Sequence, residues 1–274
     1  MGCRMPMMSQ NRPCALVAAA LVFVALATAT AHAADSAIAT RFEMYGFAGA
    51  HVLSLHSRTD EDGSRYSVAI DFKTEGMAAL FVDMTSHSQV SGRIVGGVAE
   101  PYAFRDQSRR NGTERHASMD YRPDGSVEAV TTPPLPESVP PTALRGSVDN
   151  LSAYMRLQRQ LAQTGHCGLT VRVFDGRHGY DLVFTDAGRQ ALTPSSGQNF
   201  SGDTIACHMA RRNWEGFTDN EKDEGAHTGT LWYARLVPGA LMVPVRMRMD
   251  TQLGVVEGLL AELHGRGVNL ALMQ

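Results

Sequence analysis

Lysine is almost absent from this sequence, which has only Lys73 and Lys222 among its 25 basic residues. Arginine supplies the others, a bias that is typical of a GC-rich bacterial genome and not of a particular function. The formal net charge is only -3, so the chain has no excess of positive charge that would attract nucleic acid or an anionic membrane surface. We therefore expect no nucleic-acid partner.

Catalytic sequence motifs are also missing. The chain contains no G-x-S-x-G, S-x-x-K, H-E-x-x-H or G-x-x-x-x-G-K motif and no C-x-x-C pair. These motifs mark common serine hydrolases, zinc peptidases, nucleotide-binding enzymes and thiol oxidoreductases. Their absence lowers the expectation of an enzyme, and the sequence predicts no catalytic residue, no cofactor and no metal site.

Long apolar segments are limited to one, at residues 15–29 (ALVAAALVFVALATA). Arg4 and Arg12 precede it, and residues 31–33 (AHA) follow it with the small-x-small pattern of a cleavage site. A transmembrane helix needs about 20 apolar residues, so this run is short for a membrane anchor. We expect a signal peptide at residues 1–33, cleavage after Ala33, a periplasmic location and no transmembrane segment after cleavage.

The remaining residues, 34–274, have mainly the two-residue hydrophobic period of strands, and we expect a single β-rich domain. Apolar and polar side chains alternate most clearly in residues 243–250 (VPVRMRMD). Residues 67–72 and 80–84 are also β-prone, and residues 253–263 favour a strand weakly because they contain two glycines. Short runs of this kind between turn residues predict an antiparallel sheet.

One segment has the period of a helix. It follows a proline-rich connector at residues 132–142, whose prolines lack the N–H groups that a strand needs. Asp149 or Asn150 is placed to cap the N-terminus, apolar side chains recur at helical spacing, and Gly165 ends the pattern. The sequence predicts one main helix near residues 149–163.

Two cysteines follow the expected cleavage site, and each has a histidine beside it, as His166-Cys167 and Cys207-His208. This arrangement suggests a zinc site. However, adjacent residues of a strand point to opposite faces, and the apolar alternation places both thiols on the core side and both histidines away from it. In an exported chain we expect a Cys167–Cys207 disulfide. The alternatives are two buried thiols, or metal or redox chemistry.

Residues 174–181 (FDGRHGYD) combine acidic residues, a histidine and two glycines. We interpret them as a hairpin turn in which Asp175 can accept backbone N–H groups while Gly176 and Gly179 allow positive φ angles. The alternative is an acid/base set of Asp175, His178 and Asp181, which has no nucleophile beside it.

Residues 148–153 (VDNLSA) and 174–177 (FDGR), followed by Tyr180-Asp181, resemble motifs of a bacterial exported family called domain of unknown function 3108. The resemblance extends over about residues 41 to 263. It implies a mainly β periplasmic protein with a large curled antiparallel sheet, half-barrel or β-spiral-like, around a helix. The family supplies no catalytic residue that could be transferred to this chain.

From these features we expect a non-catalytic protein of the cell envelope that binds a lipid-like ligand or an envelope protein in the concavity of its sheet and supports envelope integrity. The candidate binding residues are Trp232, Tyr233, Met247 and Met249. The alternatives are an envelope hydrolase or transferase with its site near residues 175–181, and a structural module whose sheet edge receives a strand from a partner.

Overall fold

The computed structural model describes residues 36–46, 49–76, 78–135, 140–195, 197–214, 228–251 and 254–273. All of them lie in one compact unit, Ala34–Gln274. The expected signal peptide and its cleavage site lie outside the described residues. In the described part of the chain, no helix has the length and apolar character needed to cross a membrane.

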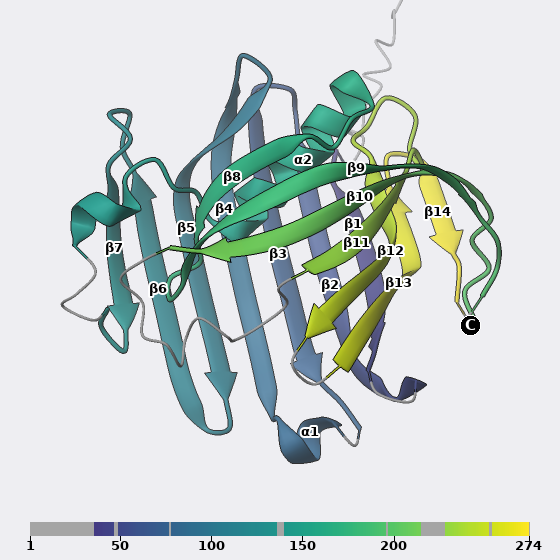
Figure 1. Ribbon diagram of the computed structural model, residues 1–274, viewed down its shortest axis with the longest axis horizontal. Coiled ribbons are helices and arrows are strands. Elements are labelled where there is room, and N and C mark those ends of the chain that lie inside the picture. Colours follow the sequence, from purple (N-terminus) through teal and green to yellow (C-terminus); the bar gives the residue numbers. More distant parts are fainter. Residues whose placement is uncertain are drawn as a thin grey trace, which may run out of the picture. The chain divides into compact units, whose positions relative to one another are not determined.

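A single antiparallel sheet dominates the described residues (Figure 1). Its hydrogen-bonded strands follow the order β7-β6-β5-β4-β3-β2-β1-β13-β12-β11-β10-β9-β8, and β14 adds to β13. The prediction of a mainly β protein with a large antiparallel sheet is confirmed. The strands are β1 Ile38–Tyr45, β2 His51–Glu61, β3 Arg65–Thr74, β4 Met84–Val95, β5 Val98–Arg110, β6 Thr113–Tyr121, β7 Val127–Thr132, β8 Leu169–Phe174, β9 Gly179–Leu192, β10 Gly202–Asn213, β11 Thr228–Ala234, β12 Val243–Thr251, β13 Gly254–Gly265 and β14 Val268–Ala271.

The main helix, α2, spans Asn150–Thr164 and agrees with the prediction for residues 149–163. The side chain of Asp149 caps its N-terminus by accepting the backbone N–H of Ser152 at 2.8 Å. Gly165 ends it in the left-handed conformation, at φ 71, and donates its N–H to the carbonyl of Leu161. A side-chain cap and a left-handed glycine satisfy backbone groups that a helix end leaves without partners.

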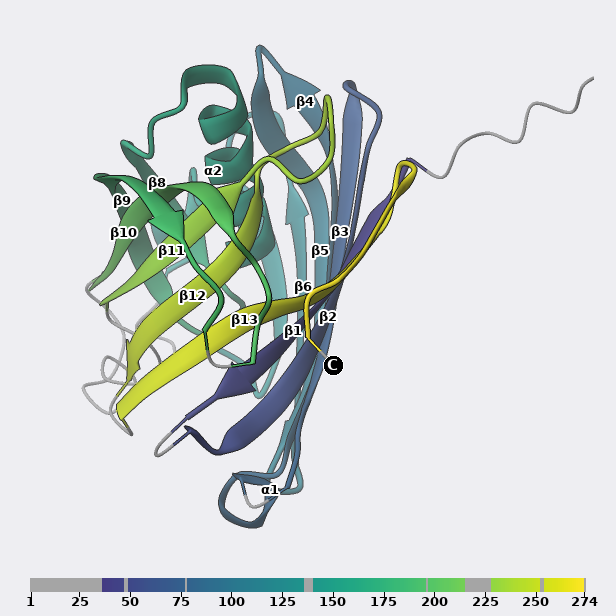
Figure 2. The ribbon, with the colours of Figure 1, turned by 90° about the vertical axis from the view of Figure 1, so that its right-hand side faces the viewer.

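The sheet curls so that its two halves face each other (Figure 2). Strands β2–β6 form one side, β8–β12 form the other, and β1 and β13 join them. Helix α2 lies between the two sides, toward the end of the sheet opposite the short helix α1, Ala78–Phe81 (Figures 1 and 2). We call the sheet surface that faces α2 the inner face and the opposite surface the outer face.

Helix α2 packs against both sides of the curled sheet. Leu151 and Met155 belong to a core with strands β3–β6, whereas Leu157 and Leu161 belong to a core with strands β8–β11. All four side chains are buried. The helix therefore occupies part of the concavity that the sequence suggested as a binding groove.

Two of the weaker strand predictions have opposite outcomes. Residues 253–263 fall almost entirely in β13, so the preference for a strand is confirmed. The prediction for residues 80–84 is wrong, because Leu80 lies in α1 and β4 begins only at Met84. The N–H of Val82 bonds to the carbonyl of Ala78, which closes a helical turn in the connection between β3 and β4. A short apolar run does not distinguish a strand from a turn of helix.

Candidate functional site

The turn between β8 and β9 is the hairpin that the sequence predicts. Oδ1 of Asp175 accepts the backbone N–H groups of Arg177 at 2.9 Å and of His178 at 2.7 Å. The N–H of Asp175 bonds back to the carbonyl of His178. Asp175 thus organises the turn, as expected for an aspartate at this position.

The two glycines of this turn have different roles. Gly176 has φ 94, and a Cβ on it would lie 2.3 Å from the Cβ of Ala117 in β6. Only glycine allows the hairpin tip to approach the inner face of β6 so closely. Gly179 does not adopt the positive φ that a glycine allows. It is the first residue of β9 and pairs with Phe174 in an extended conformation, because the turn closes one residue earlier.

The structure brings only two members of the proposed acid/base set together. Nδ1 of His178 lies 3.5 Å from Oδ2 of Asp175. Burial opposes ionisation of Asp175, but the interactions with His178 and the backbone outweigh it, and the pKa of Asp175 lies below its usual value. Asp181 instead accepts the indole N–H of Trp214 at 3.1 Å. It points to the face opposite its buried neighbours Tyr180 and Leu182 in β9.

A cavity of about 270 Å³ lies between the inner face of β3–β6 and this hairpin turn. The N-terminus of α2 and the beginning of the proline-rich connector also border it. Ligand pockets commonly have volumes of about 300 to 1,000 Å³, so this cavity suits a small molecule or part of a larger one. Its lining comprises Phe72, Met84, Ser86, Ser88, Phe104, Asp106, Ser108, Arg115, His116, Ala117, Thr132, Pro133, Pro134, Leu135, Asn150, Asp175, Gly176, Arg177 and His178.

A carboxylate surrounded by serine hydroxyls lies in this cavity. Asp106 of β5 accepts hydrogen bonds from Ser88 at 2.5 Å, Ser108 at 3.2 Å and Ser86 at 3.4 Å. Burial raises the pKa of Asp106, and the negative charge of Asp175 raises it further. The hydrogen bonds from the serines lower the pKa but do not cancel the effect of burial. We call Asp106 and these serines the Asp106 cluster.

The Asp106 cluster is absent from the candidates predicted above, although the sequence contains a signal for it. Ser86 and Ser88 occupy alternate positions of β4 that lie on the same face as the buried Val90. Inner positions of a curled sheet normally carry apolar side chains, so consecutive inner serines are unusual. Asp106, on the same face of β5 as the buried Phe104, is a second departure from the pattern.

The rest of the cavity lining includes an apolar surface. Phe72 of β3, Met84 of β4 and Phe104 of β5 provide it on the sheet, and Leu135 of the connector adds to it. Phe104 is 1 % exposed and belongs to the core that α2 makes with this side of the sheet. The cavity is therefore amphipathic, with an apolar wall and the Asp106 cluster within one space.

The four candidate binding residues lie elsewhere. Tyr233 is only 1 % exposed in the core beside α2, and Met247 and Met249 pack against the same core. Trp232 is the neighbour of Tyr233 on the opposite face, and its indole N–H donates to Oε1 of Gln190 at 2.8 Å. None of them lines the cavity described above, and their role in binding stays a prediction.

The two cysteines form a disulfide, with 5.6 Å between their Cα atoms. Both are fully buried, whereas the neighbouring His166 and His208 are exposed. This is the arrangement that the alternation of the sequence indicates, although β8 begins only at Leu169 and Cys167 precedes it. Among the described residues, no group of three or more His, Cys, Asp or Glu side chains is arranged to hold a metal ion.

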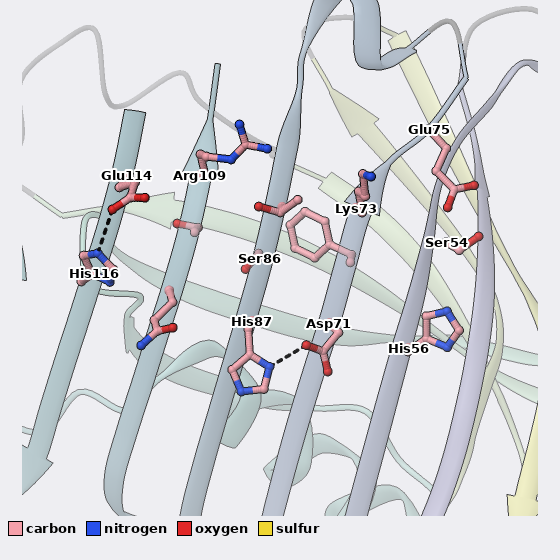
Figure 3. A pocket seen from close by; sticks show the side chains of 14 residues that line it. Ser54, His56, Asp71, Lys73, Glu75, Ser86, His87, Arg109, Glu114 and His116 are labelled. Atoms are coloured by element: carbon pink, nitrogen blue, oxygen red, sulfur yellow. Dashed lines mark hydrogen bonds and ion pairs between the residues drawn. The ribbon is translucent and has the colours of Figure 1, made fainter. Parts of the chain in front are cut away.

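A second hollow, of about 530 Å³, lies over strands β2–β6 on the outer face near the α1 end (Figure 3). It is shallow, and two ion pairs join side chains of its lining. Nδ1 of His87 lies 2.5 Å from Oδ1 of Asp71, and Nε2 of His116 lies 3.7 Å from a carboxylate oxygen of Glu114. All four side chains are about half exposed or more, so these pairs contribute little to stability.

The architecture and the inner cavity define a mainly β protein in which one curled antiparallel sheet surrounds a helix. The chain belongs to the family described as "Protein of unknown function (DUF3108)", whose model matches residues 41–261. This match confirms the resemblance found in the sequence.

Among solved structures, the chain is similar to a β-barrel-like protein of domain of unknown function DUF1849 from Brucella abortus, with 11% sequence identity and a TM-score of 0.49. The similarity covers 85% of this chain and 99% of that chain. No curated protein sequence matches this chain.

Proposed function

We propose that this protein is a non-catalytic binding protein of the bacterial periplasm that holds a small amphipathic, lipid-like molecule and supports the integrity of the cell envelope. The observation that carries the proposal is the amphipathic cavity between β3–β6 and the β8–β9 turn. Helix α2 fills the space beside β8–β11, so the binding place is the part of the concavity next to the Asp106 cluster.

Two features support binding at this place. Serine and aspartate side chains take inner positions of β4 and β5, where an apolar residue would pack more favourably. Such polar groups lower the stability of a core. A ligand with a polar and an apolar part would form hydrogen bonds with these groups and would cover the apolar wall of the cavity. Because we expect the chain to be exported, the protein would bind its ligand outside the cytoplasm.

The test is native mass spectrometry of protein isolated from the bacterial periplasm. We expect an additional lipid-sized mass that is lost under denaturing conditions. Ser88→Leu places a larger side chain in the cavity and should abolish the extra mass, whereas Gln89→Leu, on the exposed outer face of the same strand, should retain it. Ser86→Leu repeats the first substitution at the cluster's longest hydrogen bond in case Ser88→Leu does not fold. Retention of the mass in folded Ser88→Leu and Ser86→Leu proteins would contradict the proposal.

The non-catalytic part of the proposal has its own test. Asp175 and His178 lie together, but Asp181 interacts with Trp214, so the acid/base set that sequence reasoning offered as an alternative is incomplete. In bacteria that depend on this protein for envelope integrity, we expect Asp181→Asn, which lies outside the cavity lining, to support growth as the natural chain does. A loss of function in an Asp181→Asn protein of normal abundance would favour the hydrolase or transferase alternative.

A second candidate function is strand addition at β7. This strand ends the sheet and pairs only with β6 among the described strands, and its Val130 is 72 % exposed. An unpaired edge is a template for a strand from an envelope protein. The N–H of Ala129, opposite Met119 at a non-hydrogen-bonded position of the β6–β7 ladder, points to the open edge. Ala129→Pro removes this donor, so it should abolish such a complex and leave the folded monomer intact. Crosslinked complexes that are unchanged by Ala129→Pro would rule out this edge.

A further inference from the structure

We infer that the ligand of the inner cavity carries a cationic amine that binds on the Asp106 cluster. This inference rests on the proposed function, because it assigns the chemical class of the ligand's polar end. It follows from which hydrogen-bonding groups the cluster presents to the cavity.

The cluster presents acceptors and few donors. A serine hydroxyl has one proton to donate and two lone pairs with which to accept. Ser88 and Ser108 donate to the carboxylate of Asp106, and Ser86 does so more weakly. Their oxygen lone pairs remain for a ligand, together with the unused acceptor sites of the carboxylate. A primary ammonium group has three N–H donors and no acceptor, so it complements such a surface.

The charges around the cluster are mixed, so the assignment rests on the hydrogen-bond acceptors of the cluster. Asp106 and Asp175 provide two carboxylates, and His116 and His178 line the same cavity. Arg177 also lines the cavity, but its Nε donates to Nε2 of His178 at 3.3 Å on the turn. Arg115 lies opposite Ser108 on the inner face of β6 and makes an anionic ligand the competing outcome.

The apolar wall of the cavity indicates the chemical nature of the rest of the ligand. Phe72 and Met84 line the same cavity on strands next to those of the cluster. A short alkyl chain attached to the amine would bury apolar surface there at about 25 cal/mol per Å². The chemical class is therefore an alkylamine, or the amine-bearing end of a lipid.

Hexylamine, hexanol and hexanoate provide a matched series of probes that differ in the polar end. Isothermal titration at neutral pH should give a Kd for hexylamine at least about tenfold lower than for hexanol, as expected for one charge-assisted hydrogen bond, and the weakest binding for hexanoate. Asp106→Asn should reduce hexylamine to the affinity of hexanol and leave hexanol unchanged. Asp71→Asn removes a carboxylate from the outer face and should change none of the three affinities.

The outcomes separate this inference from the proposed function. Equal binding of hexylamine and hexanol, or tighter binding of hexanoate, would overturn the amine assignment while the cavity remains a binding site. No binding of any probe would overturn both.

If Asp106→Asn does not fold, Ser108→Ala replaces it. This variant removes one hydroxyl of the cluster and should weaken hexylamine by about two- to fivefold relative to hexanol. Equal weakening of both probes would contradict the inference.

Discussion

The two sides of the curled sheet are built from the same antiparallel hairpins but differ in what their inner faces carry. On the side of β8–β11, which we call the disulfide side, the inner residues Leu182, Phe184 and Leu231 are buried against α2. On the side of β3–β6, the cavity side, Ser88 and Asp106 occupy inner positions and a cavity remains. The same architecture thus serves stability on one side and leaves room for a ligand on the other.

The difference shows which departures from a pattern are informative. On the disulfide side, the apolar alternation and the covalent link between Cys167 and Cys207 both favour a rigid core. On the cavity side, polar residues lie where the alternation predicts apolar ones, which costs stability. Natural proteins tolerate such a cost at functional sites. Four substitutions test this contrast, in order of decreasing expected effect.

The largest effect is expected from removal of the disulfide. The two cysteines are separated by 40 residues. Replacing both with alanine should lower the free energy of unfolding by about 4 kcal/mol, because the unfolded chain regains the entropy of an open loop. Denaturant unfolding under oxidising conditions measures the change. A loss below about 1 kcal/mol would mean that the disulfide side does not need its covalent link.

Leu157→Ala should be nearly as severe. This side chain is fully buried between α2 and the disulfide side, and its removal leaves a cavity that costs about 3 kcal/mol. The control is Leu80→Ala in α1, where the side chain is 76 % exposed and the loss should stay below about 0.5 kcal/mol. Similar midpoints for the two variants in urea would contradict the assignment of the core.

Gly176→Ala tests the contact between the two sides. The new Cβ would meet Ala117 at 2.3 Å, and the residue has φ 94. Strain and overpacking together should cost about 2 kcal/mol. Adding Ala117→Gly relieves the collision, so the double variant should recover part of the loss. A thermal unfolding midpoint of the double variant below that of Gly176→Ala would show that the hairpin tip does not dock here.

Asp106→Asn should have the smallest effect on stability, and that effect depends on pH. An unfolded aspartate has a pKa of about 3.9, and burial raises the pKa of Asp106 in the folded protein. The folded state therefore binds this proton more tightly, and the free energy of unfolding falls as pH rises from the unfolded to the folded pKa. The size of the fall is about 1.4 kcal/mol per unit of pKa difference. An asparagine does not titrate, so the free energy of unfolding of Asp106→Asn lacks this fall. As pH rises from 3 to 7, the variant should therefore become more stable relative to the natural chain. A pH-independent difference between the two unfolding curves would contradict the assignment.

The sequence predicts most of the fold because the deciding signals are local. The alternation of residues 243–250, the cap at Asp149 and the αL glycine at Gly165 each act within a few residues, and all three agree with the structure. The disulfide follows from alternation as well. The prediction of a strand at residues 80–84 is wrong, because so short a segment carries too little periodic signal to distinguish a strand from a turn of helix.

The candidate site is less predictable because it is assembled from distant segments. Asp106 lies in β5, whereas Asp175 lies in the turn before β9, and no local pattern indicates that they share a cavity. The predicted binding residues Trp232 and Met247 have large apolar side chains, and such side chains are equally typical of a core. Inner serines at Ser86 and Ser88 are the signal that points to the cavity, but they become visible only after the inner face is known.

The most direct test of the account is to locate a neutral amphiphile among the methionines. With isotope-labelled methionine methyl groups, a titration with hexanol followed by nuclear magnetic resonance should shift the signal of Met84, which lines the cavity. The signals of Met247 and Met249, which pack in the disulfide-side core, should not move. Shifts at Met247 and Met249 with an unchanged Met84 would place the ligand on the disulfide side and contradict the central claim.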